Sequence, residues 1–202
     1  LNLYHHGDSS QDEPEYHDGH SSESRYWGPI MGSADDAKMV QWSDGNYTSA
    51  TNKNQDDLEI ITNYGLSYRT DDYGNDSATG ENISISNMPA TRYGIIERST
   101  DIDVFNVTYS SIGKVQIAGT DVKMSILDSE EIIVYEQTSD STEEALTEII
   151  LEPGTYQVSI QGDSSGNPYG DNATGWSSYG SLGQYQLSFF PDPLFSDAIE
   201  QY

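Results

Sequence analysis

The sequence predicts a mainly β protein, in which an antiparallel β-sandwich follows a small region of loops and one helix. Hydrophobic and polar residues alternate over several short stretches in the second half of the chain, which is the pattern of half-buried strands. Asp, Glu, Pro and Gly residues separate these stretches, as expected for turns. About seven such strands are typical of a sandwich.

The first third of the chain predicts loops and a single helix. Residues 1 to about 26 are polar and lack a periodic hydrophobic pattern, so we expect a long loop there. A helix is predicted over 54–65, with Asn54 as its N-cap and two aspartates at the positive end of its dipole. Leu58 and Ile61 fall on one face of this helix, and Gly65 ends it.

The domain boundaries follow from changes in composition. The first domain is expected over 1–67, an Asp-, Asn-, Gly- and Ser-rich linker over 68–93, the sandwich over 94–190 and a loosely docked tail over 191–202. Strands are predicted at 104–107, 115–117, 122–127, 132–135, 146–151, 156–160 and 185–189.

A long loop rich in Gly, Ser, Asn and Tyr is expected before the last strand. Its aromatic residues, among them Trp176 and Tyr179, have two interpretations. They cover an open end of the sandwich, or they stack on sugars and grip an extended peptide.

Charge excludes two classes of partner. The 202 residues include 34 Asp and Glu but only 8 Lys and Arg, for a net charge of −26. Such a surface repels phosphate backbones and anionic lipid, so we expect no nucleic-acid partner and no binding to an anionic membrane. No apolar run reaches the roughly 18 residues of a membrane span. Because cysteine is absent, disulfides and thiolate sites are excluded.

Five Asn-x-Ser/Thr sequons favour a secreted, glycosylated protein. The chain is rich in Ser and Thr, so chance occurrence is the alternative. The candidate glycosylation sites are Asn46, Asn75, Asn82, Asn106 and Asn172.

The chain begins with Leu-Asn-Leu-Tyr-His-His, and a Trp-Gly-Pro-Ile-Met-Gly segment follows at 27–32. Residues 16–61, which include the segment 27–32, resemble the end of the catalytic domain of secreted, reprolysin-like zinc metallopeptidases of the metzincin type. Metzincins carry His-Glu-x-x-His-x-x-Gly-x-x-His and a later Met-turn. The resemblance implies that His5 is the third zinc ligand and Met31 the Met-turn residue. Its other marks are Tyr16, Gly19-His20, Gln41-Trp42-Ser43 and Asp56-Asp57-Leu58.

Two residues depart from the metzincin pattern. Asn2 stands where the motif has Gly, at the point where the chain turns out of the helix. Asn is the non-glycine residue that best tolerates a left-handed conformation, so the turn is expected to survive. His6 stands where relatives often have Asp, which leaves the surroundings of the third ligand open.

Residues 94–190 resemble a bacterial pre-peptidase C-terminal domain, a β-sandwich module often attached to secreted peptidases. The resemblance rests on three segments of the sequence. They are Asp101-x-Asp103-Val104-Phe105, Leu151-x-Pro153-Gly154-Thr155-Tyr156 and Tyr179-Gly180-Ser181-Leu182-Gly183-Gln184-Tyr185.

Together the resemblances imply the C-terminal portion of a secreted zinc endopeptidase, with Zn²⁺ in the intact parent and a protein or peptide as substrate. The remaining ligands and the general-base Glu are expected before residue 1, in a chain that is an incomplete gene model or a processed fragment. We expect the chain alone to be inactive. The alternative is a non-catalytic extracellular adhesion, binding or assembly glycoprotein of peptidase ancestry. Its partners would be matrix or glycan, and its self-assembly is left open.

A second metal is suggested by carboxylates in the linker. Asp71, Asp72 and Asp76 lie close together in the sequence around a glycine, as oxygen ligands do in calcium loops. The bidentate Glu of an EF-hand is missing, so a looser Ca²⁺ site and an acidic turn are the two interpretations. Asp101 and Asp103 form another calcium candidate, with an ordinary strand edge as the alternative.

Overall fold

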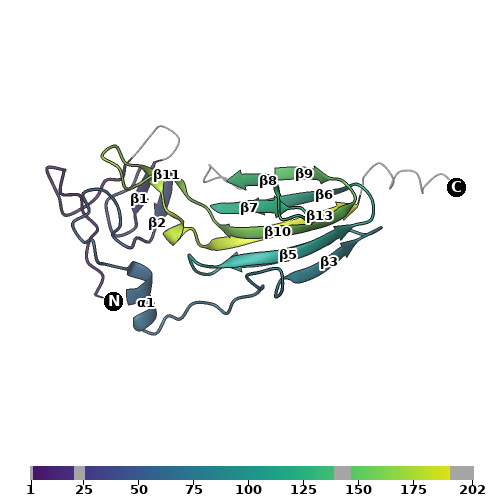
Figure 1. Cartoon of the computed structure of the whole chain (residues 1–202). Coiled ribbons are helices and arrows are strands. Elements are labelled where there is room, and N and C mark those ends of the chain that lie inside the picture. Colours follow the sequence, from purple (N-terminus) through teal and green to yellow (C-terminus); the bar gives the residue numbers. More distant parts are fainter. Residues whose placement is uncertain (1, 21–25, 139–146, 192–202) are drawn as a thin grey trace.

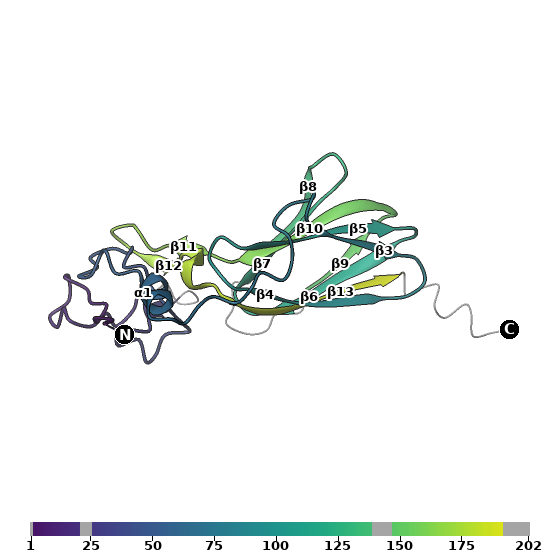
Figure 2. The same cartoon turned by 90° about the horizontal axis from the view of Figure 1, so that it is seen from below.

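The computed structural model describes residues 2–20, 26–138 and 147–191, and within them two β-sheets pack face to face (Figures 1 and 2). The mainly β class is thereby confirmed. One sheet has the strand order β3 (Glu81–Ile85), β5 (Ile102–Tyr109), β10 (Gly154–Gly162), β7 (Val122–Leu127) and β8 (Ile133–Thr138). The other has the order β4 (Ala90–Ile96), β13 (Gly183–Pro191), β6 (Gly113–Gly119) and β9 (Thr147–Leu151).

Apolar side chains that alternate with polar ones along the strands form the core between the two sheets. Val158 of β10 pairs with Phe105 of β5, and both side chains are fully buried. Leu187 and Phe189 of β13 enter the same core from the other sheet. All seven strands predicted from the sequence are present, as β5 to β10 and β13. Strands such as β6 and β7 bury one apolar face, whereas β8 leaves Ile133 and Val134 exposed.

Two parts of the predicted architecture were wrong. The segment 68–93, predicted to be a linker, contains β3 and most of β4, so the sandwich begins at Glu81. β3 has only two buried isoleucines among polar residues, which is too short a pattern to stand out in the sequence. β3 also pairs with β5 in parallel, so the sandwich is not wholly antiparallel.

The N-terminal region contains little regular structure. β1 (Trp27–Pro29) pairs in parallel with β2 (Met39–Gln41), and α1 (Asp57–Asn63) is a short helix. The N-cap is Asp56 and not Asn54: the Asp56 carboxylate accepts the Glu59 N–H at 2.7 Å. Gly65 has φ 92° just after the helix, as its predicted role in ending the helix requires. Within the described residues, helix length and composition fall short of what crossing a membrane needs.

The long loop before β13 joins the N-terminal region to the sandwich. It contains β11 (Ser165–Asn167), β12 (Thr174–Trp176) and the 3₁₀ turn η1 (Ser178–Gly180), at the same end of the sandwich as β1 and β2 (Figure 1). Trp176 is 2% exposed, and the Tyr179 hydroxyl donates to Asp56 of the α1 cap at 2.6 Å. These two rings therefore cover that end of the sandwich, which was the first interpretation.

A buried carboxylate, Asp121, lies at the centre of this junction. Its Oδ1 accepts the Trp176 indole N–H at 2.9 Å, and its Oδ2 accepts the side-chain amide of Gln41. Gln41 in turn accepts the Trp27 indole N–H at 2.9 Å. Hydrogen bonds from both sides thus satisfy one acid in the turn between β6 and β7.

We predict that Asp121→Ala destabilises the protein by about 2–4 kcal/mol, because two buried donors lose their acceptor. Asp121 has φ 58°, a conformation that Asn also tolerates, so Asp121→Asn keeps the shape and one acceptor and is the matched control. Asp121→Asn should therefore lower the free energy of unfolding by less than Asp121→Ala does. Urea unfolding followed by tryptophan fluorescence measures both variants, and equal stabilities of Asp121→Ala and the wild type would contradict the role of Asp121.

Candidate metal centre

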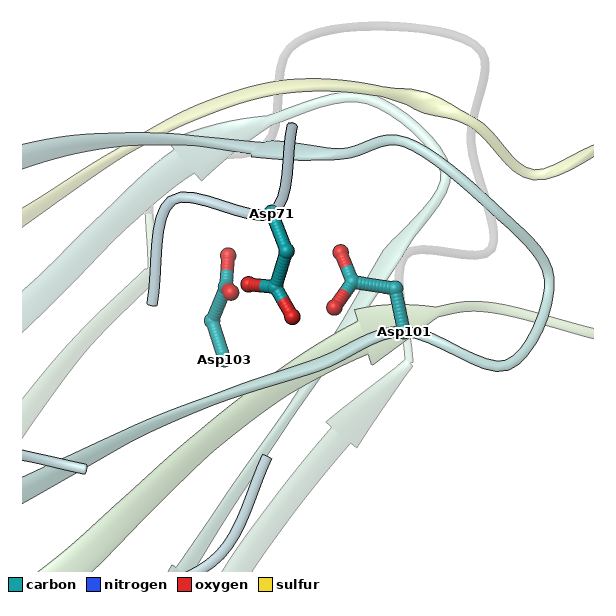
Figure 3. A group of neighbouring side chains, drawn as sticks. All are labelled: Asp71, Asp101 and Asp103. Carbon is teal, nitrogen blue, oxygen red and sulfur yellow. The ribbon is translucent and has the colours of Figure 1, made fainter. Parts of the chain in front are cut away.

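Three aspartates meet at the edge of the sandwich where the segment before β3 crosses the start of β5 (Figure 3). One carboxylate oxygen from each of Asp71, Asp101 and Asp103 lies within 4.8 Å of the others. Asp101 and Asp103 are two residues apart along an extended chain and so point to the same side. Gly74 accepts the Val104 N–H at 3.0 Å, which holds the Asp71 segment against β5.

A fourth carboxylate, Glu97, follows β4 and faces Asp101. Glu97, Asp101 and Asp103 are 6%, 3% and 0% exposed. Asp103 Oδ2 accepts the Tyr185 hydroxyl at 2.6 Å, and Asp101 Oδ2 accepts the Glu97 N–H at 3.3 Å. The other oxygen of each aspartate and both oxygens of Glu97 are buried and accept no hydrogen bond from the described residues. Ionised oxygens in that state are strongly destabilising unless a cation lies among them.

The pKa values of these carboxyl groups are raised because their ionised forms are buried and lie close to one another. Burial, followed by the neighbouring acids, raises the pKa of Asp103 to about 8 even though the Tyr185 hydroxyl opposes the shift. Burial and the Asp101 carboxylate raise the pKa of Glu97 to about 7. Asp72 also has a raised pKa, first from burial and then from Glu97. The metal-free site therefore keeps protons that a cation would displace.

The donor set indicates which cation fits. All the candidate ligands are carboxylate oxygens, and they come from separate segments of the chain. Calcium takes six to eight oxygen ligands in flexible geometry, whereas zinc sites are usually built with imidazole or thiolate. These residues thus fit Ca²⁺, with water completing the coordination.

The predicted calcium ligands have separate outcomes. Asp71 belongs to the carboxylate group, and Asp101 and Asp103, predicted as a second candidate, lie in the same group. Asp76 faces its own turn, where its Oδ1 accepts the N–H groups of Ala78 and Thr79 at 3.0 and 2.8 Å. Glu97 was missed, although it lies only four residues before Asp101, because its place in the turn between β4 and β5 does not give the spacing of a known calcium loop.

The candidate zinc ligand, His5, lies in the N-terminal region and is not a member of this carboxylate group. Its Nδ1 lies 2.8 Å from Glu15 Oε1, and its Nε2 lies 3.5 Å from the Tyr16 hydroxyl. Asn2 has φ 55°, the left-handed conformation expected for the residue in the glycine position. Next to His5, the His6 N–H donates to the Met31 carbonyl at 2.8 Å, so the turn at Met31 contacts this segment.

Three further histidines have structural partners. His6 is fully buried and pairs with Asp57 of α1 at 3.0 Å. His20 Nε2 donates to the Gly175 carbonyl at 2.7 Å, which leaves its Nδ1 to accept from His17 Nε2 at 3.3 Å. Burial and the neighbouring His20 lower the pKa of His17 to about 4. His17 and His20 are therefore neutral at pH 7, and they help to hold the N-terminal region on β12.

The candidate glycosylation sites differ in exposure. Asn46, Asn75, Asn82 and Asn172 are exposed. Asn106 is half-buried in β5, next to Asn82 in the register, and its Nδ2 donates to the Ser77 carbonyl at 2.9 Å. An oligosaccharyltransferase would have to break this bond, so Asn106 is the sequon that the fold disfavours.

No family model matches the sequence, and no curated protein matches it. Among solved structures, the chain is similar to the pre-peptidase C-terminal domain of a collagenase from Bacillus anthracis, with 13% identity, a TM-score of 0.38 and coverage of 56% of this chain and 99% of that one. It is also similar to the periplasmic inhibitor of g-type lysozyme from Aeromonas hydrophila, with 10% identity, a TM-score of 0.37 and coverage of 55% and 95%. Both likenesses are weak.

The raised pKa values make a directional prediction for the metal-free protein. Between about pH 4 and pH 8 the folded site holds protons that unfolded carboxyls have released, so the free energy of unfolding falls as pH rises. Thermal unfolding from pH 7.5 to 8.5 in a chelator tests this, well above the ordinary histidine pKa of 6.5, near which His17 and His20 take up protons in the unfolded chain and oppose the slope. Saturating Ca²⁺ should flatten the slope. A metal-free midpoint that rises over this range would contradict the prediction.

Proposed function

We propose that this chain is an extracellular calcium-binding accessory module of a peptidase. The observation that carries the calcium site is the group of buried carboxylate oxygens of Glu97, Asp101 and Asp103 with no donor, facing the exposed Asp71. Ca²⁺ would satisfy these oxygens and remove the repulsion among them. The weak likeness to a collagenase accessory domain is in keeping with this role.

Calcium would act here as a clamp between segments of the chain. Asp71 comes from the segment between α1 and β3, whereas Asp101 and Asp103 come from the start of β5. A cation shared among them fixes the connecting segment to the sandwich.

Asparagine substitutions test the calcium site. Asp101→Asn should stabilise the metal-free protein, because a desolvated negative charge is removed, and should abolish the stabilisation that calcium gives. Asp71→Asn should weaken binding by at least about tenfold, since the loss of one charged ligand costs about 1.4 kcal/mol or more. Calorimetric titration and thermal unfolding with Ca²⁺ measure both effects.

Asp76→Asn is the matched control for the calcium experiment. Asp76 lies in the same acidic segment, but its carboxylate caps its own turn, so this variant should bind Ca²⁺ as the wild type does. Equal losses in the Asp71 and Asp76 variants would show that only general negative charge attracts calcium. Absence of calcium binding to the wild-type chain would overturn the proposal.

A second candidate function is the one that the metzincin resemblance implies, in which His5 supplies the third ligand of a catalytic zinc. Two observations favour it: the left-handed Asn2 and the contact of the Met31 turn with the segment of His5 and His6. An open groove of about 370 Å³ also lies beside His5, lined by Tyr4, Pro14, Glu15, Thr51 and Asn52. Zinc would polarise a peptide carbonyl and activate water there.

The zinc function is tested in a longer protein that includes the residues encoded upstream of Leu1. We expect one zinc per chain, chelator-sensitive peptide cleavage, and loss of both in His5→Ala. Asp71→Asn should leave zinc content unchanged, which separates the two metal sites. An upstream sequence without His-Glu-x-x-His, or zinc retained in His5→Ala, would sink this candidate while leaving the calcium proposal intact.

A further inference from the structure

The free edge of β8 presents an unusual run of apolar residues. Among the described residues, β8 is the last strand of its sheet and pairs with β7 alone. Ile132, Ile133 and Val134 are 56%, 56% and 47% exposed, although they are consecutive in the sequence. An edge strand has unpaired backbone N–H and C=O groups, so β8 offers hydrogen bonds. Ile132, whose own backbone is bonded to Asp128, adds only its side chain to the apolar surface.

The opposite edge of the same sheet lacks this character. On β3, the exposed residues are Asn82 and Ser84, and the Glu81 carboxylate accepts from Arg92 at 2.6 to 2.9 Å. Polar and charged side chains are the usual protection of an edge strand against pairing with another chain. The edge at β8 is thus the apolar one of the two.

A bulge limits how β8 pairs. Ile126 is opposite Tyr135 and Leu127 is opposite Ile133, so Val134 has no partner on β7. Bulges twist an edge away from a flat partner and disfavour indiscriminate stacking of strands. A ligand of this edge must therefore be a short strand whose affinity comes largely from side chains that contact Ile132, Ile133 and Val134.

Charge identifies the occupant. Two exposed acids, Glu130 and Glu131, directly precede the apolar run, and the whole chain carries −26. A second copy of the chain would bring the same acids and the same net charge to the contact, which disfavours self-pairing. A peptide with lysine or arginine beside β-branched residues complements both features.

We propose that the β8 edge binds an extended, basic and β-branched peptide segment of a partner protein by strand addition. The peptide backbone pairs with the free edge of β8, its apolar side chains cover Ile132 to Val134, and a basic side chain lies near Glu130 and Glu131. This surface is separate from the carboxylate group and from His5, so it adds a partner that neither metal site requires.

The test uses the full chain and a synthetic decapeptide that alternates Val and Thr and has Lys at both ends. The control peptide has the same sequence but carries N-methyl groups on all of its central amides, which keep its charge and remove the N–H donors from both of its edges. Amide NMR shifts should change along β8 with the first peptide and not with the second. Equal binding of both peptides, or no binding, would overturn the proposal.

Two exposed apolar residues provide matched protein variants. Ile133→Lys should weaken binding about tenfold or more. Met88→Lys, at a 77% exposed residue between β3 and β4, should bind as the wild type does. Sedimentation of the free chain is measured in parallel: a dimer that Ile133→Lys disrupts would show that the occupant is a second copy, and would refute the peptide proposal.

Discussion

The structure depends on how buried negative charge is neutralised. In a chain with 34 acidic and 8 basic residues, carboxylates greatly outnumber the cations available to pair with them. Most acids avoid the difficulty by remaining in water. A few are buried where the sandwich meets its connecting segments, and each of these requires either hydrogen-bond donors or a cation. A buried acid with hydrogen-bond donors stabilises its part of the fold, whereas a buried acid without donors marks a place where a cation would be stabilising.

Asp121 and Asp103 illustrate the two solutions. Both carboxyls are buried, and burial raises the pKa of Asp121 to about 7 and that of Asp103 to about 8. Both oxygens of Asp121 accept hydrogen bonds from neutral donors, Trp176 and Gln41, so this acid is satisfied by the protein itself. Asp103 has one donor, Tyr185, and its second oxygen faces other acids. The arrangement at Asp121 joins two parts of the molecule, whereas the arrangement at Asp103 is the one that supports the proposed cation site.

The sequence predicts this fold wherever the local pattern and the tertiary environment agree. β10, for example, alternates over most of its length, and the seven strands predicted from such local patterns are all present. β3 was missed because two isoleucines among polar residues do not reveal whether a neighbour will bury them. Asp56 caps α1 in place of Asn54 because the chain enters the helix two residues later than the composition suggests.

Prediction of the carboxylate site failed in part for a similar reason. Asp71 and Asp76 are equivalent in composition, but Asp76 uses its carboxylate to cap its own turn, an outcome set by local geometry. Glu97 lies four residues before Asp101 in the connection from β4 to β5, where its N–H donates to Asp101 Oδ2, a local turn that does not follow the spacing of a known calcium loop. Sequence therefore identified the acidic segment and the acids at the start of β5, but only the fold joins them.

The carboxylate group at Asp71 and the hydrogen bonds of Asp121 lie at two different attachments between the N-terminal region and the sandwich. The region is attached to the sandwich by the covalent segment from α1 to β3, which passes Asp71, and by the hydrogen bonds around Asp121. Loss of a cation would free the first attachment and leave the second in place, since the donors to Asp121 are neutral. The N-terminal region would then stay docked while the connecting segment loosens. A bound calcium ion would therefore order the connecting segment, whereas the Asp121 hydrogen bonds, together with the contacts of Tyr179 and His20, hold the region that carries His5.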